Sequence, residues 1–270
     1  MLRDITLGQY FPGDSFLYKM DPRMKILLTI VYLVLIFTVK NYAGYAAVLL
    51  LLIITVKSTD IPFGYILKGI KPIMVFIVFT AVLNLFMTGG DVIWKWGFLR
   101  VTRQGINYAV FMIVRIVLLM AGTSMLTYTT SPITLTDGIE RLLSPFSRIG
   151  LPAHELAMMM TIALRFIPTL IEETDKIMKA QSARGADFET GNIVHRAKSL
   201  VPLLVPLFIS AFRRADELAT AMECRCYRGG ENRTRMHVLK MTGVDAAAAC
   251  IMLAFCTAVI TLNIYFGSVL

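Results

Sequence analysis

The sequence predicts an all-α, polytopic membrane protein with about five transmembrane helices and a cytoplasmic domain of long amphipathic helices. Hydrophobic residues make up 56% of the 270 residues and charged residues only 17%, a composition that favours the bilayer over water as the solvent. The charges gather between about residues 130 and 242, where apolar residues recur at helical spacing. This segment predicts amphipathic helices and not further membrane spans.

Five apolar segments are candidates for the membrane spans, because about 20 apolar residues cross a hydrocarbon core. The first two are short and lie on either side of Lys40-Asn41, which predicts a tight helical hairpin. The chain then divides into an N-terminal membrane domain with four transmembrane helices (1–129), a helical domain (130–242) and a C-terminal transmembrane helix (243–270). The expected spans are Ile26–Val39, Tyr42–Val56, Ile70–Phe86, Ile106–Tyr128 and Val244–Ile264.

The basic residues predict the side of the membrane that each loop faces. Fifteen of the 27 lysines and arginines lie between Arg141 and Lys240, and others precede the first span or separate the second from the third. Because basic loops stay in the cytoplasm, the N-terminus and the helical domain are predicted to be cytoplasmic, in a multi-pass protein of the plasma membrane. The residues before the first span lack the apolar core of a signal peptide. The opposite side would carry Lys40, Lys95, Arg100 and Arg103.

Three amphipathic helices are expected in the segment 130–242. A short helix ends near Gly150, a long one runs from Pro152 to about Ala183, and a third ends near Tyr227. The long helix would measure roughly 45 Å at a rise of 1.5 Å per residue. Its second half is too charged to cross a membrane, so we expect it to begin near the membrane and then to protrude from it or lie along it.

The two longer helices share features that suggest a weak internal repeat. Asp175 and Arg184 lie nine residues apart in one, and Asp216 and Arg225 lie nine apart in the other. Chance can also produce such spacing in two amphipathic helices. Pro168 is expected to kink the first of them, because proline removes one backbone hydrogen bond.

Motifs for catalysis are absent from the sequence. It contains no G-x-x-x-x-G-K-[ST] phosphate loop, no H-E-x-x-H and no G-x-S-x-G, so the chain is not expected to hydrolyse ATP or to act as an enzyme. His154, His195 and His237 lie in polar contexts near helix ends, where surface or capping roles are expected. The four cysteines form no C-x-x-C pair, which predicts free thiols and no metal site. No nucleic-acid-binding motif accompanies the net charge of +9, so this charge is expected to face anionic lipid or acidic partners.

Arg115 is the one basic residue inside a predicted span, and a charge at that depth is costly unless it is paired or close to water. Either it faces another helix of this protein or of a partner, or the span is offset so that the side chain reaches an interface. Asp245 is the acidic residue of another span, but its place at the very edge makes it a poor partner. The sequence leaves these alternatives open.

Two arginines lie at expected helix ends, in Ala183-Arg184-Gly185 and in Cys224-Arg225-Cys226. A guanidinium beside small residues can fork onto a carboxylate or onto backbone carbonyls of a partner. It can also cap its own helix or remain solvated. Spacing alone does not decide between these roles.

Both triplets resemble the paired Ala-Arg-Gly signatures of the transmembrane, or T, component of energy-coupling factor (ECF) transporters, the EcfT/CbiQ-like family. The resemblance covers nearly the whole chain, although the apolar spans add little specificity to it. Further matching blocks are Asp21-Pro22-Arg23 with Lys25, Thr136-Asp137-Gly138-Ile139-Glu140, Ala163-Leu164-Arg165-Phe166-Ile167-Pro168 and Tyr227-Arg228-Gly229-Gly230.

The resemblance implies a coupling subunit, of the shared-module type, in an ATP-driven importer of vitamins or other micronutrients. Two cytoplasmic ATPase subunits would each receive one arginine-bearing helix end in a surface groove. ATP binding would move the two helices and tilt or release a substrate-binding membrane subunit, so ATP is used by the partners and this chain binds no cofactor. Cys224 and Cys226 replace the expected Ala and Gly, which would make the second joint bulkier or redox-sensitive.

The family also implies that the apolar faces of the long helices contact the substrate-binding subunit, which can be one of several interchangeable ones. Methionines suit such a surface, because unbranched and polarizable side chains repack against different partners. Ordinary core packing is the alternative for each of these residues. The expected contacts are Leu156, Met159, Met160, Leu164, Ile167, Ile171, Leu203, Leu207 and Ala211.

Three other functions compete with this interpretation. A dedicated permease subunit for one cargo, such as biotin or cobalt, would have a single substrate-binding partner. A polytopic membrane enzyme would need a buried acid, base or metal cluster, which the sequence does not offer. A scaffold on anionic membranes would work normally after charge reversal at Arg184 and Arg225.

Overall fold

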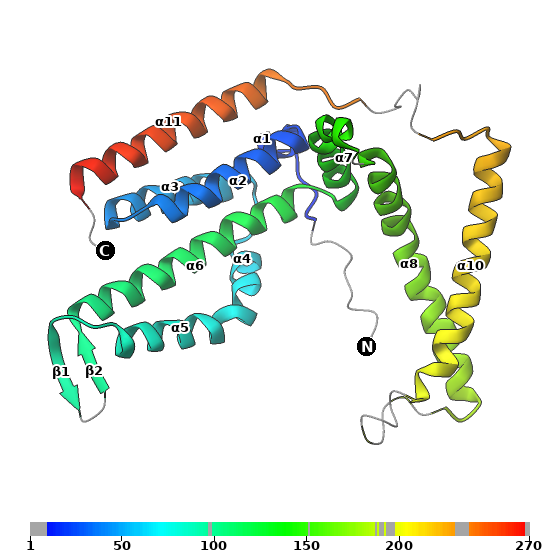
Figure 1. The fold of residues 1–270 in the computed structure, drawn as a ribbon, viewed down its shortest axis with the longest axis horizontal. Helices are drawn as coiled ribbons and strands as arrows, with labels where there is room; N and C mark the ends of the chain where they lie inside the picture. Colours follow the sequence, from blue (N-terminus) through cyan, green and yellow to red (C-terminus); the bar gives the residue numbers. More distant parts are fainter. Residues whose placement is uncertain are drawn as a thin grey trace. The chain divides into compact units, whose positions relative to one another are not determined.

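The computed structural model describes residues 10–96, 99–150, 152–186, 188, 192, 198–229 and 238–267, and these residues are mostly helical (Figure 1). The all-α class predicted from the sequence is confirmed, with one small two-stranded hairpin added to it. In chain order the elements are α1 (Phe16–Lys19), α2 (Pro22–Thr38), α3 (Tyr42–Ser58), α4 (Phe63–Ile70), η2 (Lys71–Ile73), α5 (Met74–Met87), β1 (Val92–Trp96), β2 (Leu99–Thr102), α6 (Arg103–Thr129), α7 (Pro132–Leu143), η3 (Ser144–Ile149), α8 (Ala153–Ala183), α10 (Val201–Cys224) and α11 (Gly243–Phe266).

The chain folds as two compact units, divided after Gly138 and again at residue 238. The membrane unit contains α1 to α6, the first half of α7, and α11. The helical unit contains the rest of α7, η3, α8 and α10. The first division lies inside α7, later than the domain boundary expected at residue 130, because Gly138 packs against α2. A Cβ atom at this glycine would lie 3.1 Å from Pro22 Cβ.

Within the membrane unit, α2 and α3 are joined by a short turn at residues 39–41, as the sequence predicts, and each of them packs against α6 and α11. Asp21 caps α2 by accepting a hydrogen bond from Arg23 N at 2.9 Å. Asn41 caps α3 in the same way, accepting from Gly44 N at 2.8 Å. Each helix has 17 residues and is therefore about 26 Å long.

Polar contacts tie α2, α6 and α11 together at one end of the membrane unit. Buried Asp245, in the first turn of α11, accepts a hydrogen bond from Asp21 N at 2.8 Å. Buried Lys25 donates from Nζ to the carbonyl oxygen of Thr129, at the end of α6, at 2.9 Å. These buried polar groups are tolerated because each has a partner. We refer to Asp21, Lys25, Thr129 and Asp245 as the Asp21 layer.

A second polar layer joins the α2–α3 turn to the end of α11. Asn263 of α11 accepts a hydrogen bond from Lys40 N at 3.3 Å, and Asn41 Nδ2 donates to Leu262 O at 2.9 Å. We refer to these residues as the Asn41 layer. In α11, 18 residues separate Asp245 from Asn263, which corresponds to about 27 Å. This spacing is close to the ≈ 30 Å thickness of the hydrocarbon core of a bilayer, so we expect the two layers to lie near its edges.

Apolar side chains of α2, α3 and α6 fill the space between the two layers. The Tyr32 hydroxyl, itself buried, donates to Leu118 O at 2.9 Å. Its ring lies against Gly122, where a Cβ atom would come within 2.0 Å of Tyr32 Cε1. Gly122 therefore allows α2 and α6 to approach closely. The most buried core residues include Leu35, Ile36, Val48, Val56, Phe111, Leu118 and Val259.

The third predicted span is longer than expected. It runs from Phe63 to Met87 through α4, η2 and α5, and it is mostly apolar, with Lys68 and Lys71 in its first half. Pro72 cannot donate a backbone hydrogen bond, and it lies in η2, the short 3₁₀ helix that separates α4 from α5.

The β1–β2 hairpin, between the third and fourth spans, was not predicted. Its strands are antiparallel, with Val92 opposite Thr102. The Thr102 hydroxyl donates to Thr88 O at 2.9 Å and accepts from Gly105 N at 3.0 Å, so this residue joins the hairpin to the start of α6. The short strands lie between two long apolar helices, and their own sequence carries no clear alternation of apolar and polar residues.

Among the described residues, four helical stretches are long and apolar enough to cross a membrane, and α3 is a shorter apolar helix. Three of the four correspond to predicted spans, and multi-pass membrane architecture is confirmed. The fourth is α8, for which we expected no span. Its charged residues gather after Ile171, so the first half of the helix forms the apolar stretch.

In the helical unit, α8 and α10 lie side by side and run in opposite directions (Figure 1). Gln181, near the end of α8, donates from Nε2 to Pro202 O at 3.4 Å. Near the other end of the pair, the Tyr227 hydroxyl lies 3.1 Å from Met158 Sδ. Pro168 lies inside α8 without ending it.

Candidate coupling surface

The end of α8 is closed by a backbone motif built around Arg184. Gly185 N donates to Ser182 O and Ala186 N donates to Gln181 O, both at 3.0 Å, which is the Schellman arrangement. Gly185 has a φ of +87°, in the left-handed region that favours glycine. The backbone thus satisfies the last carbonyls of the helix without the Arg184 side chain.

The end of α10 repeats this motif residue for residue. Cys226 N donates to Glu223 O at 2.8 Å, and Tyr227 N donates to Met222 O at 3.0 Å. Arg225 therefore takes the same capping position as Arg184, and the nine-residue spacing to a preceding aspartate falls on equivalent positions. One difference remains: Cys226 adopts a φ of +56°, where a residue with a Cβ atom is strained by about 1 kcal/mol.

All six predicted coupling residues are exposed: Ala183, Arg184, Gly185, Cys224, Arg225 and Cys226. Within the described part of the chain, neither arginine side chain has a hydrogen-bond or ion-pair partner. Because α8 and α10 run in opposite directions, the two arginines lie at opposite ends of the pair. The 23 residues from Met158 to Gln181 place these ends about 35 Å apart. The structure therefore forms two separate arginine-tipped surfaces and not one site.

Polar and apolar contacts both hold the pair together. Glu173 of α8 accepts hydrogen bonds from Ser210 Oγ and from Arg214 Nη2, the latter at 2.7 Å. Leu203 of α10 is 6% exposed and is the buried apolar residue of that helix. The ion pair is partly open to solvent, so burial of the apolar stripe is the stronger stabilising contribution.

The nine predicted contacts to a substrate-binding subunit do not share one environment. Leu156, Met159 and Met160 are exposed on the first half of α8, with Met159 the most open at 56%. Leu203 is buried inside the helical unit, so it is not available to a partner in this structure. The half-buried residues are Leu164, Ile167, Ile171, Leu207 and Ala211.

The first half of α10 carries a larger exposed apolar face that the sequence analysis missed. Phe208 and Phe212 are 60% and 68% exposed and lie four residues apart, one turn along the helix. The signal was present in the sequence, because residues 200–212 are almost entirely apolar all round the helix, and not along one stripe. The exposed residues are Leu200, Val201, Leu204, Val205, Phe208, Ile209 and Phe212.

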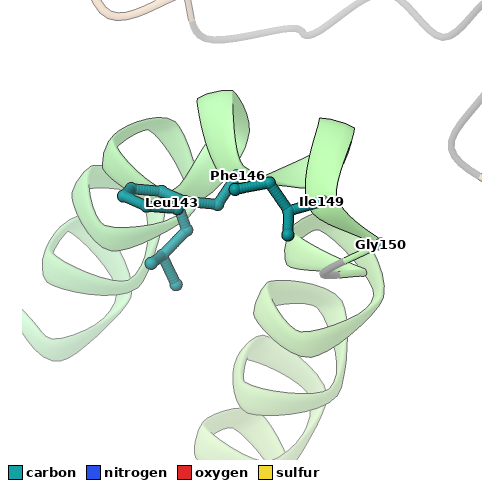
Figure 2. A pocket seen from close by; sticks show the side chains of 4 residues that line it. All are labelled: Leu143, Phe146, Ile149 and Gly150. Carbon is teal, nitrogen blue, oxygen red and sulfur yellow. The ribbon is translucent and has the colours of Figure 1, made fainter.

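A shallow apolar hollow of about 330 Å³ lies where α7 passes into η3 (Figure 2). It is lined by Leu143, from the end of α7, by Phe146 and Ile149, from η3, and by Gly150. Ile149 is 83% exposed. These four residues offer no acid, base or nucleophile, so the hollow extends the exposed apolar surface of the helical unit and is not a catalytic pocket.

The structure describes only part of the predicted histidine sites and of the late sequence block. His154 Nδ1 lies 2.9 Å from Glu140 Oε1, which agrees with a role at a helix end. The structure describes Tyr227, Arg228 and Gly229 of the late block, whereas Gly230, His195 and His237 lie outside the described residues.

The apolar spans define a polytopic all-α membrane protein, to which a unit with two exposed arginine-tipped helix ends is joined. The family model described as cobalt transport protein, CbiQ, matches residues 13–237. The energy-coupling factor transporter transmembrane protein EcfT of Ruminiclostridium cellulolyticum is 58% identical over 266 residues, which cover 98% of this chain and 100% of that protein. The protein of the same name from Clostridium kluyveri is 57% identical over 270 residues, covering 99% and 100%, and that from Bacillus subtilis is 48% identical over 248 residues, covering 92% and 94%.

The chain therefore belongs to the EcfT/CbiQ family, as its sequence blocks indicated. It is the transmembrane component of an energy-coupling factor transporter, a membrane subunit and not an enzyme.

Proposed function

We propose that the chain couples two cytoplasmic ATPase subunits to a substrate-binding membrane subunit, for ATP-driven uptake of a vitamin or another micronutrient. The observation that carries the proposal is the pair of matching caps, in which Arg184 and Arg225 take the same position of the same backbone motif. Each guanidinium is exposed and unpartnered among the described residues. A permanently charged planar fork in that state suits a carboxylate or the carbonyl groups of a partner.

The separation of the two caps supports two ATPase partners. At about 35 Å, the two caps are far enough apart for each to meet its own subunit. ATP is bound by these subunits, and this chain binds no cofactor of its own. The 31-residue α8 and the 24-residue α10 are packed against each other and can pass a movement of the caps along their length.

Exposed apolar residues of the helical unit support contact with a substrate-binding membrane subunit. Met159 and Met160 on α8 and Phe208 and Phe212 on α10 are large, apolar and open. Exposed apolar surface of this extent marks a protein or membrane contact. Methionine and a non-directional apolar face also suit several interchangeable partners, which favours a shared module.

The orientation follows from the basic residues. The helical unit holds most of the lysines and arginines, and the Asn41 layer holds few. We therefore place the N-terminus and the helical unit in the cytoplasm, where the ATPases are.

Co-purification tests the proposal. The full chain is expressed with its ATPase pair, and the double variant Arg184→Glu, Arg225→Glu is compared with wild type. Lys179→Glu, Arg213→Glu is the matched control, because both of these residues are exposed on the same two helices but lie outside the caps. We expect the ATPases to be lost with the cap variant alone. Equal recovery with both variants would place the joints elsewhere, and no ATPase with wild type would contradict the coupling role.

A dedicated subunit for a single cargo is the second candidate, because the family description names cobalt. Co-expression with several different substrate-binding subunits separates the two. A shared module co-purifies with each of them, whereas a dedicated one retains a single partner.

A further inference from the structure

Arg115 lies within the membrane unit and contacts two other helices of this chain. Its Nε atom donates to the buried Tyr45 hydroxyl of α3 at 2.8 Å. Its Cζ atom lies 5.8 Å from the centre of the Phe37 ring of α2, and that ring is 63% exposed. Asp245 lies in the Asp21 layer and is not its partner.

The depth of Arg115 follows from the two polar layers. On α6, 14 residues separate it from Thr129 in the Asp21 layer, which corresponds to about 21 Å. The layers are about 27 Å apart, so Arg115 lies about 6 Å inside the Asn41 layer. Its neighbours agree, because Phe37 is one residue from the end of α2 and Tyr45 is in the first turn of α3. A depth of about 6 Å is within the reach of an arginine side chain that extends to the interface.

In the described part of the chain, the outer part of the guanidinium has no hydrogen-bond or ion-pair partner. Nε is used by Tyr45, whereas Nη1 and Nη2 make no hydrogen bond there and are not fully buried. A charge left in this state beside hydrocarbon is costly. An anion held in the interface removes that cost.

The surroundings of Arg115 match a lipid headgroup region. Tyr42 and Tyr108 are 47% and 37% exposed near the same layer, and such tyrosines are typical of the membrane interface. The exposed Lys40 lies in the turn beyond Phe37 and adds a second positive charge. The exposed Phe37 ring offers an apolar surface for an acyl chain.

We propose that Arg115 binds the phosphate of a phospholipid, with Nη1 and Nη2 as a two-pronged donor and Phe37 against the lipid chain. A phosphodiester presents two oxygens in the geometry that a guanidinium matches. The lipid completes the hydrogen bonding of Arg115 and fixes the depth of α6 next to the α2–α3 hairpin. This site is independent of the arginine caps and of any protein partner.

Native mass spectrometry of the full chain in detergent tests the site, with dioleoyl phosphatidylglycerol as the probe. We expect wild type to retain the lipid, Arg115→Gln to retain it about tenfold more weakly, and Arg115→Lys to fall between them, because lysine keeps the charge but loses the fork. Arg103→Gln, at the exposed first residue of the same helix, is the matched control and should behave as wild type. Thermal unfolding of each variant shows whether it is folded.

Five results would overturn the proposal. If Arg115→Gln and wild type retain the lipid equally, Arg115 does not bind it. If wild type retains dioleoylglycerol as strongly as dioleoyl phosphatidylglycerol, the phosphate is not recognised. Full displacement by millimolar inorganic phosphate would make this a site for the free anion. Loss of the lipid when the chain assembles with its partners would assign Arg115 to a partner carboxylate. If Arg115→Gln does not fold, Arg115→Lys with unchanged retention overturns the proposal by itself.

Discussion

At the scale of single residues, Gly185 and Cys226 show how the same backbone cap is built from different side chains. Both residues follow a capping arginine, and both have a positive φ, +87° and +56°. Glycine adopts this conformation without steric cost, whereas cysteine is strained in it. The arginine thus takes the same position in both caps, and the cap at Cys226 is the less stable of the two.

Substitution at these two positions should affect stability differently. Gly185→Ala is expected to lower the free energy of unfolding by about 1 kcal/mol, because it places a Cβ atom in the left-handed region. Cys226→Gly is expected to leave stability unchanged or raise it slightly, since relief of strain is offset by the greater freedom of glycine in the unfolded chain. Chemical unfolding of the full chain in detergent measures both, and an equally stable Gly185→Ala variant would contradict this account of the cap.

At the scale of elements, the pairing of α8 with α10 depends on apolar burial more than on its ion pair. Leu203 is 6% exposed, whereas the Glu173 and Arg214 side chains are 22% and 36% exposed. We expect Leu203→Ala to lower the free energy of unfolding by about 2 kcal/mol. Glu173→Gln should lower it by less than about 1 kcal/mol. The reverse order, measured in the same unfolding experiment, would show that the polar contacts dominate.

How far the sequence predicts these elements depends on how local the signals are. The α2–α3 hairpin followed from Lys40-Asn41 between two short apolar runs, and the helix ends at Arg184 and Arg225 followed from the residues around them. These are signals within a few residues. The direction of α10 relative to α8 depends on contacts such as Gln181 with Pro202, far apart in sequence, which no periodicity reveals.

Two expectations from the sequence, on α10 and on α8, differ from the structure for physical reasons. Leu203 belonged to a stripe expected to face a partner, but the opposite face, with Phe208 and Phe212, is the exposed one, because α10 is apolar on all sides over its first half. In α8, the charges of the second half indicate a surface helix, although the first half is an apolar stretch long enough to cross a membrane.

At the scale of the whole molecule, the distance between the two polar layers gives the thickness of the membrane unit. The Asp21 layer joins the starts of α2 and α11 to the end of α6, and the Asn41 layer joins the α2–α3 turn to the end of α11. Their spacing of about 27 Å agrees with one layer lying at each surface of the bilayer. From the positive-inside rule we predict that Lys40 lies outside the cell and the helical unit inside.

Labelling with a membrane-impermeant maleimide tests this orientation. In a chain whose four cysteines are replaced by serine, Lys40→Cys should react in intact cells. A chain that keeps Cys226 alone should react after the membrane is opened, because Cys226 is exposed on the helical unit. The opposite pattern would invert the topology and would exclude contact with cytoplasmic ATPases.

We propose above all that the two arginine caps bind two different ATPase subunits. Site-specific photo-crosslinking tests it most directly, with benzoylphenylalanine in place of Ala183 or of Cys224, the exposed residues that precede the two arginines. In the assembled transporter, we predict that each position crosslinks an ATPase and that the two positions reach different subunits of the pair. Crosslinks from both positions to one subunit, or to no ATPase at all, would contradict the claim.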